Sequence, residues 1–153
     1  ITQQLKLGPR SILNYALSGG GFLNNNQLHF IDYKHFMGNE FFLQIGDPLN
    51  NFRMLPYYKY STSQWFLQAH AFWSFQRFLL TNFEKVRTTG VKETLQLHYL
   101  KVPGIKNYTE LGYGFDEIMR IGRLEIIGQF EGLKIQSIGL RIGTSIQVGK
   151  GRR

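Results

Sequence analysis

Three charged residues, Glu110, Glu125 and Arg141, are the part of this sequence most suggestive of chemistry. Side chains alternate between the two faces of a β-strand, and this alternation assigns all three to the inner face of three consecutive predicted strands. Two carboxylates that converge on a substrate could act as general acid and general base. Opposite charges on a buried wall can instead pair with each other, because an isolated buried charge is costly. No motif frames a substrate, so we expect a structural charge ladder and not an enzyme.

The histidines offer two further possibilities. His70 and His98 are predicted to face the interior from neighbouring strands, where they could titrate between about pH 5 and 8 or pack as polar parts of the wall, which we favour. His29, Asp32 and His35 could suggest a metal site, but on a strand the two histidines share one face while Asp32 points to the other. The sequence has no cysteine to add a thiolate ligand. We expect no metal or other cofactor.

An aromatic cluster precedes the clearest strand and consists of Phe52, Tyr57, Tyr58 and Tyr60. Such rings could stack on sugars or dock a partner protein. They could also fold down to plug a barrel or brace a loop at its rim. We favour bracing or plugging.

The elements that must position these residues are about ten residues long and alternate between apolar and polar side chains. In the clearest, 63–74, Trp65 and Trp73 lie on the apolar face about 26 Å apart, at about 3.3 Å per residue. That spacing matches the apolar band of a membrane β-barrel, about 25 Å tall and flanked by aromatic girdles. Tyr99 in the next stretch is assigned to the same girdle. A transmembrane β-strand needs about 9–11 residues.

Counting such stretches predicts about eight strands, at 2–7, 11–18, 27–36, 63–74, 89–100, 107–115, 122–130 and 135–148. Between them, 36–62 is a long segment without a steady period, and loops of this length are usually functional or plug-like. If the last strand ends on the periplasmic side, the connections near 19–26, 75–88 and 116–121 are periplasmic. Segment 36–62 is then an extracellular or plug loop.

Composition narrows the classes of protein. The chain has 153 residues, 15% aromatic and 18% charged, with 17 glycines, which favours one all-β domain. No run of 18 apolar residues could form a membrane helix. The net charge of +8 is scattered except in the basic tail 149–153, so we expect no nucleic-acid partner. Basic residues beyond an apolar band would instead meet anionic lipid head groups.

Several runs resemble an outer-membrane family of the Bacteroidota. They are 35–40 (HFMGNE), 52–62 (FRMLPYYKYST) and 67–70 (LQAH), with 107–114 (NYTELGYG) and 138–143 (IGLRIG) similar to the final strands of that family. Its members carry an N-terminal carboxypeptidase-regulatory-like β-sandwich followed by a large barrel of unknown function. Segment 78–87 lacks the Pro-Leu-Leu run associated with the family, and the chain ends in 149–153 rather than in an aromatic residue. The resemblance implies the C-terminal part of a larger barrel, with no established activity and no catalytic residues.

These observations predict an antiparallel transmembrane β-barrel segment over 1–148, followed by the tail, in a bacterial outer membrane. Its function would be non-enzymatic: transport, envelope assembly or a surface protein complex. Its partners would be outer-membrane lipids or lipopolysaccharide and other outer-membrane or surface proteins. The alternative is a soluble, lipocalin-like barrel that binds an apolar ligand, in which Leu97, Leu111, Leu124 and Leu140 would pack inward.

Overall fold

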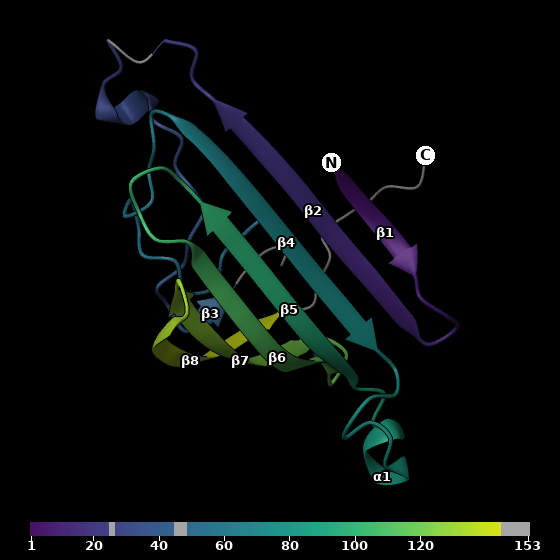
Figure 1. Cartoon of the computed structure of the whole chain (residues 1–153). Helices are drawn as coiled ribbons and strands as arrows, with labels where there is room; N and C mark the ends of the chain where they lie inside the picture. Colours follow the sequence, from purple (N-terminus) through teal and green to yellow (C-terminus); the bar gives the residue numbers. More distant parts are fainter. Residues whose placement is uncertain (25–26, 45–48, 145–153) are drawn as a thin grey trace.

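The computed structural model describes residues 1–24, 27–44 and 49–144 and is built almost entirely of strands (Figure 1). Because polar and apolar residues alternate along them, most of these segments can bury one face and expose the other, as a sheet requires. The elements are β1 (Thr2–Lys6), β2 (Ser11–Gly21), η1 (Phe30–Asp32), β3 (Leu43–Gln44), β4 (Trp65–Phe75), α1 (Glu84–Arg87), β5 (Lys92–Lys101), β6 (Tyr108–Ile118), β7 (Gly122–Glu131) and β8 (Lys134–Thr144).

All strands belong to one sheet with the order β1-β2-β4-β5-β6-β7-β8-β3. Its seven longer strands pair antiparallel, and the two residues of β3 join β8 in parallel. The predicted all-β antiparallel architecture is confirmed at this level. Among the described residues β1 and β8 do not pair, so the sheet is open.

Burial along β5, β6 and β7 alternates residue by residue. The register aligns inward residues across the sheet: His98 lies opposite Glu110, and Glu125 lies opposite Arg141. The outward positions between them carry leucine, isoleucine and aromatic side chains. The sheet therefore has one face that carries buried charged and histidine side chains among apolar ones, and one face that is mainly apolar.

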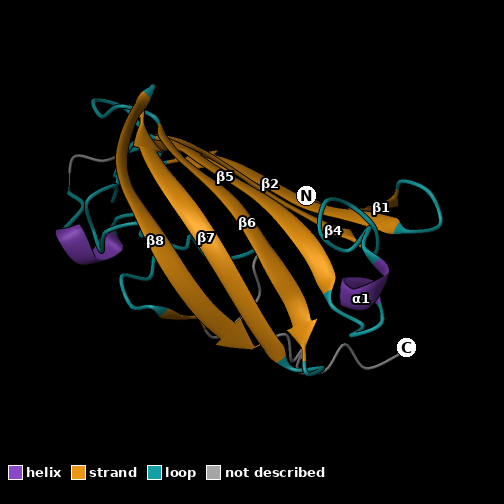
Figure 2. Ribbon diagram, turned by 90° about the horizontal axis from the view of Figure 1, so that it is seen from below, coloured by secondary structure: helices purple, strands orange, loops and turns teal. Residues whose placement is uncertain are grey.

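The face with the buried charged side chains is the covered one. Figure 2 shows the strands arching over the loops that connect β2 to β4. Seven buried residues form the main hydrophobic cluster between this connection and the sheet: Phe36, Phe52, Leu55, Tyr60, Leu100, Val102 and Tyr108. Phe36 and the stretch 52–60 thus pack against the inner face of the sheet at β5 and β6.

The predicted strand at 27–36 is wrong. Residues Phe30–Asp32 form a 3₁₀ turn, in which the backbone N–H of His29 donates to the Asp32 carboxylate at 3.1 Å. Only a single bridge, between Lys34 and Thr62, follows. His29 and His35 therefore do not share a strand face.

Because 27–36 is not a strand, the predicted assignment of the connections to the two ends of the sheet also changes. Gly21 pairs with Trp65, so the whole connection 22–64 leaves and returns at one end. The prediction put the connection near 19–26 at the same end as 75–88 and 116–121. The described residues 22–24, which follow β2, instead lie at the opposite end, because there is one strand fewer between them and β4. The basic tail 149–153 and the end of the predicted strand 135–148 lie outside the described residues.

The other end of the sheet carries the β1–β2 turn, the connection 76–91 with α1, and the short β6–β7 turn. Among the described residues, neither helix has the length or apolarity to cross a membrane.

Candidate functional site

The candidate site is a buried polar network between the inner face of the sheet and residues 52–60. Its centre is Glu110 on β6, which is fully buried. The Glu110 carboxylate accepts the backbone N–H of Arg53 at 2.7 Å and that of Met54 at 2.8 Å, and the Tyr108 hydroxyl donates to it at 2.6 Å. Buried backbone amides need such acceptors. The Glu110 side chain therefore accepts the backbone hydrogen bonds of Arg53 and Met54 that the carbonyl groups of a neighbouring strand would accept in a regular sheet.

The side chain of Arg53 extends the network along the wall. Its Nε donates to the Gln96 carboxamide at 3.2 Å and lies 3.5 Å from the Glu125 carboxylate. Gln96 in turn donates to Glu125 at 2.6 Å. Both ends of the Arg53–Glu125 ion pair are 1% exposed, and a buried pair of this kind needs such added hydrogen bonds to offset the loss of hydration.

Two further arginines complete the charge balance. Arg123 lies 2.8 Å from Asp116 and 3.6 Å from Glu125, and its guanidinium stands over the Phe72 ring. Arg141 on β8 donates from Nε to the backbone carbonyl of Arg53 at 2.9 Å. The Arg53 residue is thus held at its amide by Glu110 and at its carbonyl by Arg141.

The histidines lie beside this network. The Nδ1 atoms of His70 and His98 are 2.7 Å apart, which requires that one ring carries a proton there and the other accepts it. The Phe52 ring packs on both, with centroids 4.7 Å from His70 and 6.1 Å from His98. Phe52 therefore packs against the inner face of the sheet next to Arg53. The hydrogen bonds from Glu110 and Arg141 to the backbone of residues 53–54 are called the Arg53 clamp below.

A second contact fixes the end of the segment. Tyr60 is buried, packs on Tyr108 at 5.2 Å between centroids, and donates its hydroxyl to Glu131 at 3.2 Å. Lys59 forms an ion pair with the same carboxylate. Burial, and then the negative charge of Glu131, raises the pKa of Tyr60 above its ordinary value.

Close backbone packing holds the segment to itself. A Cβ atom on Gly38 would lie 2.2 Å from the carbonyl oxygen of Leu55, so only glycine permits this approach. The Phe52 amide donates to the Met37 carbonyl at 2.9 Å. Residues 37–38 therefore pack directly against residues 52–55, which include the two residues whose amides Glu110 binds.

The charged and histidine residues predicted for the site lie together on one face of the sheet. Glu110, Glu125, Arg141, His70 and His98 are all buried on the inner face. Glu125 and Arg141 are register partners, but Glu125 forms its ion pairs with Arg53 and Arg123. The ladder therefore includes residues that the prediction left out: Arg53, Gln96, Asp116 and Arg123.

The predicted aromatic groups divide between exposed and buried positions. Trp65 is 49% exposed, and Trp73 and Tyr99 are partly exposed on the outer face. In the loop cluster, Phe52 and Tyr60 are buried against the wall, whereas Tyr57 and Tyr58 are exposed. Only half of that cluster braces the segment against the sheet.

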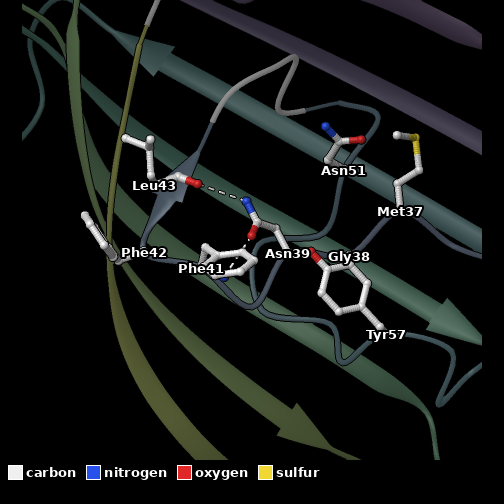
Figure 3. A pocket seen from close by; sticks show the side chains of 8 residues that line it. All are labelled: Met37, Gly38, Asn39, Phe41, Phe42, Leu43, Asn51 and Tyr57. Atoms are coloured by element: carbon white, nitrogen blue, oxygen red, sulfur yellow. Dashed lines mark hydrogen bonds between the residues drawn. The ribbon is translucent and has the colours of Figure 1, made fainter.

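A cavity of about 520 Å³ lies beside this segment (Figure 3). Asn39 shapes it: its side chain donates to the Leu43 carbonyl at 3.0 Å and accepts the Phe41 amide at 2.8 Å. The lining residues are Met37, Gly38, Asn39, Phe41, Phe42, Leu43, Asn51 and Tyr57. Aromatic rings beside amides can stack on the flat face of a sugar or of an aromatic side chain.

The buried network is suited to holding a segment in place. Glu110 and Glu125 accept hydrogen bonds or ion pairs from the segment and the wall, and neither lines the cavity. Within the described ranges, no group of three or more His, Asp or Glu side chains could hold a metal ion.

Comparison with known proteins places the chain in a family. A family model described as the C-terminal domain of a family of unknown function (DUF5686) matches residues 1–115, from β1 into β6 and including the segment with Arg53 and Tyr60. No curated protein and no solved structure matches the chain. The chain therefore belongs to the DUF5686 family and carries its C-terminal domain.

Proposed function

We propose that this chain forms part of the wall of a bacterial outer-membrane β-barrel whose interior is occupied by residues 52–60. One observation carries the proposal: burial is inverted relative to a water-soluble protein. Charged residues are buried on the inner face, while Leu97, Leu111 and Leu140 on the outer face are 43%, 50% and 52% exposed. Contiguous apolar surface on this scale is rare on soluble monomers.

Strand length supports the same location. From β4 to β8 each strand has 10 or 11 residues, the length that a tilted strand needs to cross the hydrocarbon core. The two tryptophans of β4 stand eight positions apart on its outer face, one of them at the first residue of the strand. Aromatic side chains at both rims of the apolar band would suit the membrane interfaces.

The open sheet supports a larger barrel. In a bilayer each backbone N–H and C=O must find a partner, so an unpaired strand edge is not tolerated. The edge at β1, and the part of β8 that the two residues of β3 leave unpaired, would then be joined by further strands of the natural protein. Together with the family resemblance, this favours a longer bacterial protein of the Bacteroidota with an N-terminal carboxypeptidase-regulatory-like β-sandwich.

The clamp at Arg53 supports an occupied interior. It holds residues 52–60 across β5, β6, β7 and β8, so solute passing beside these strands would have to displace them. We therefore propose a non-enzymatic wall with a fixed inner segment that serves transport, envelope assembly or a surface protein complex. Its partners would be outer-membrane lipids or lipopolysaccharide and other outer-membrane or surface proteins.

The lipocalin-like alternative requires an apolar interior. The four leucines that it places inward, at positions 97, 111, 124 and 140, face outward. The covered face instead holds buried glutamate, arginine and histidine beside its apolar cluster. This arrangement supports the membrane proposal over the alternative.

Fractionation of cells that produce the full-length protein tests the proposal. We expect the protein in the outer-membrane fraction, extracted only by detergent, and migrating faster on gel electrophoresis before heating than after. Recovery as a folded monomer in the aqueous fraction without detergent would contradict it.

A further inference from the structure

A basic pocket of about 310 Å³ lies at the end of the sheet opposite to the 22–64 connection. Its lining residues come from the β1–β2 turn, from the connection 76–91 that contains α1, and from the start of β5. Four of its lining residues are cationic and donate hydrogen bonds from long side chains: Arg10, Arg77, Arg87 and Lys92. The other lining residues are Gln76, Gly90 and Val91.

The backbone brings these residues together from separate segments. Ser11 pairs with Phe75, and the Gln76 amide donates to the Arg10 carbonyl at 2.9 Å. This contact sets Arg10 beside Gln76 and Arg77. Arg87 ends α1, and its carbonyl accepts the Gly90 amide at 3.1 Å, which returns the chain toward β5.

The connection itself is anchored to the sheet. The Glu93 carboxylate accepts the backbone amides of Leu80 and Thr81 at 2.9 and 3.0 Å, as well as the Thr81 hydroxyl. The Phe78 ring stacks on Phe75 with centroids 4.6 Å apart. The pocket is therefore a constructed part of the fold.

Two nearby carboxylates already have partners, and one of these partners is the pocket-lining Lys92. Glu93 is occupied by Thr81 and Leu80, and Glu117 forms an ion pair with Lys92. In the part of the chain that the structure describes, Arg10, Arg77 and Arg87 make no ion pair. The positive charges of Arg10 and then Arg87 lower the pKa of Arg77, so the gathered guanidiniums repel one another.

We propose that this pocket binds a phosphate group, supplied by the head group of an anionic phospholipid. Planar guanidinium groups pair with phosphate oxygens through two parallel hydrogen bonds, and a bound anion would relieve their repulsion. The same connection exposes Leu79, Leu80 and Phe83, which suit contact with acyl chains. The lipid as source rests on the proposed membrane location, where this strand end would lie at head-group depth; the phosphate site does not.

Binding to the full-length protein in non-ionic detergent at low ionic strength tests the inference. Titrations by calorimetry would use dihexanoyl-phosphatidylglycerol, inorganic phosphate, and dihexanoyl-glycerol as a lipid without phosphate. We expect phosphatidylglycerol to bind more tightly than phosphate, and dihexanoyl-glycerol not to bind. The triple variant R10Q/R77Q/R87Q should bind phosphatidylglycerol about tenfold more weakly or worse, because it loses charged hydrogen bonds. Added NaCl should weaken binding to the unaltered protein.

Arg120→Gln is the matched control, since Arg120 lies at the same end of the sheet, in the β6–β7 turn, and does not line the pocket. It should bind as the unaltered protein does. The triple variant should melt at the same temperature or higher, because it removes repulsion and no ion pair. Equal binding by the triple variant would overturn the site. Phosphate binding as tight as phosphatidylglycerol, lost in the triple variant, would support the phosphate site and overturn the lipid source. Phosphate binding that is lost in the triple variant, in a protein that stays folded and monomeric without detergent, would uphold the phosphate site and overturn the proposed membrane location.

Discussion

The carboxylate of Glu110 binds the main chain of Arg53: it accepts the Arg53 amide at 2.7 Å, and the adjacent Met54 amide at 2.8 Å. From β8, Arg141 donates to the Arg53 carbonyl. An aperiodic segment laid against a sheet has no strand to pair its backbone groups. Here the charged side chains of the wall take that role, which explains why they are buried where a soluble barrel would place leucine.

Glu110→Gln tests this clamp. Glutamine has the same shape, but its NH₂ group would face a backbone N–H with no acceptor between them. We expect the free energy of unfolding to fall by about 2–4 kcal/mol, with faster hydrogen exchange at the Arg53 and Met54 amides. Glu117→Gln, which breaks a partly exposed ion pair with Lys92, should cost less than about 1 kcal/mol. Equal losses of unfolding free energy in the two variants would contradict a stabilising role of the Glu110 hydrogen bonds to the Arg53 and Met54 amides.

The buried Arg53–Glu125 pair should couple strongly. Each of the single changes Arg53→Met and Glu125→Gln removes one charged partner of a buried group that keeps its remaining contacts, and should cost about 3 kcal/mol. The double variant should cost less than the sum of the two, because neither charge remains. Chemical denaturation of the three variants measures this. Additive losses would mean that the two side chains do not interact.

Tyr60 should make stability depend on alkaline pH. Its folded-state pKa is raised above the ordinary value, so the folded protein keeps a proton that the unfolded chain releases. Its contribution is present below about pH 10 and is lost as pH rises above it. The unfolding free energy should therefore fall more steeply between about pH 9 and 11 in the unaltered protein than in Tyr60→Phe. Identical slopes would contradict the burial of the Tyr60 hydroxyl against Glu131.

Regular alternation made the strands from β4 to β8 predictable, because each segment has one polar and one apolar face. The same argument failed at 27–36, where polar residues sit close together and Asp32 bonds the His29 backbone. A local turn that satisfies its own amides competes with pairing in a sheet. Because this predicted strand is absent, the connection that follows β2 lies at the opposite end of the sheet from the one predicted.

The wall side of the site was predictable by parity, since Glu110, Glu125 and Arg141 share one face. Arg123 lies on the same face by the same rule and could have been included. Arg53 could not, because it lies in a segment without a period, and only tertiary packing brings it to Gln96 and Glu125. Parity identifies the face of a strand but not what covers it.

Charge on the outer face should be costly in a membrane. Leu111→Arg places a guanidinium in the middle of the outer face of β6 and should reduce stability in lipid by about 2–4 kcal/mol. Leu133→Arg is the control, because Leu133 is fully exposed in the β7–β8 turn beyond the strands and should change stability little. Refolding into vesicles over a urea series measures both. Similar small effects would indicate that Leu111 faces water.

Contact between the outer face and lipid chains is the most direct test of the account. The chain has no cysteine, so Leu97→Cys, Leu111→Cys and Leu140→Cys each give one labelling site, with Leu133→Cys as the control. The full-length protein, with any cysteine outside this chain replaced by serine, would carry a fluorophore at one of these sites at a time and be reconstituted in lipids with brominated acyl chains. Strong quenching at the three strand positions and weak quenching at position 133 is the predicted result. Equal, weak quenching at all four positions would contradict a lipid-facing wall.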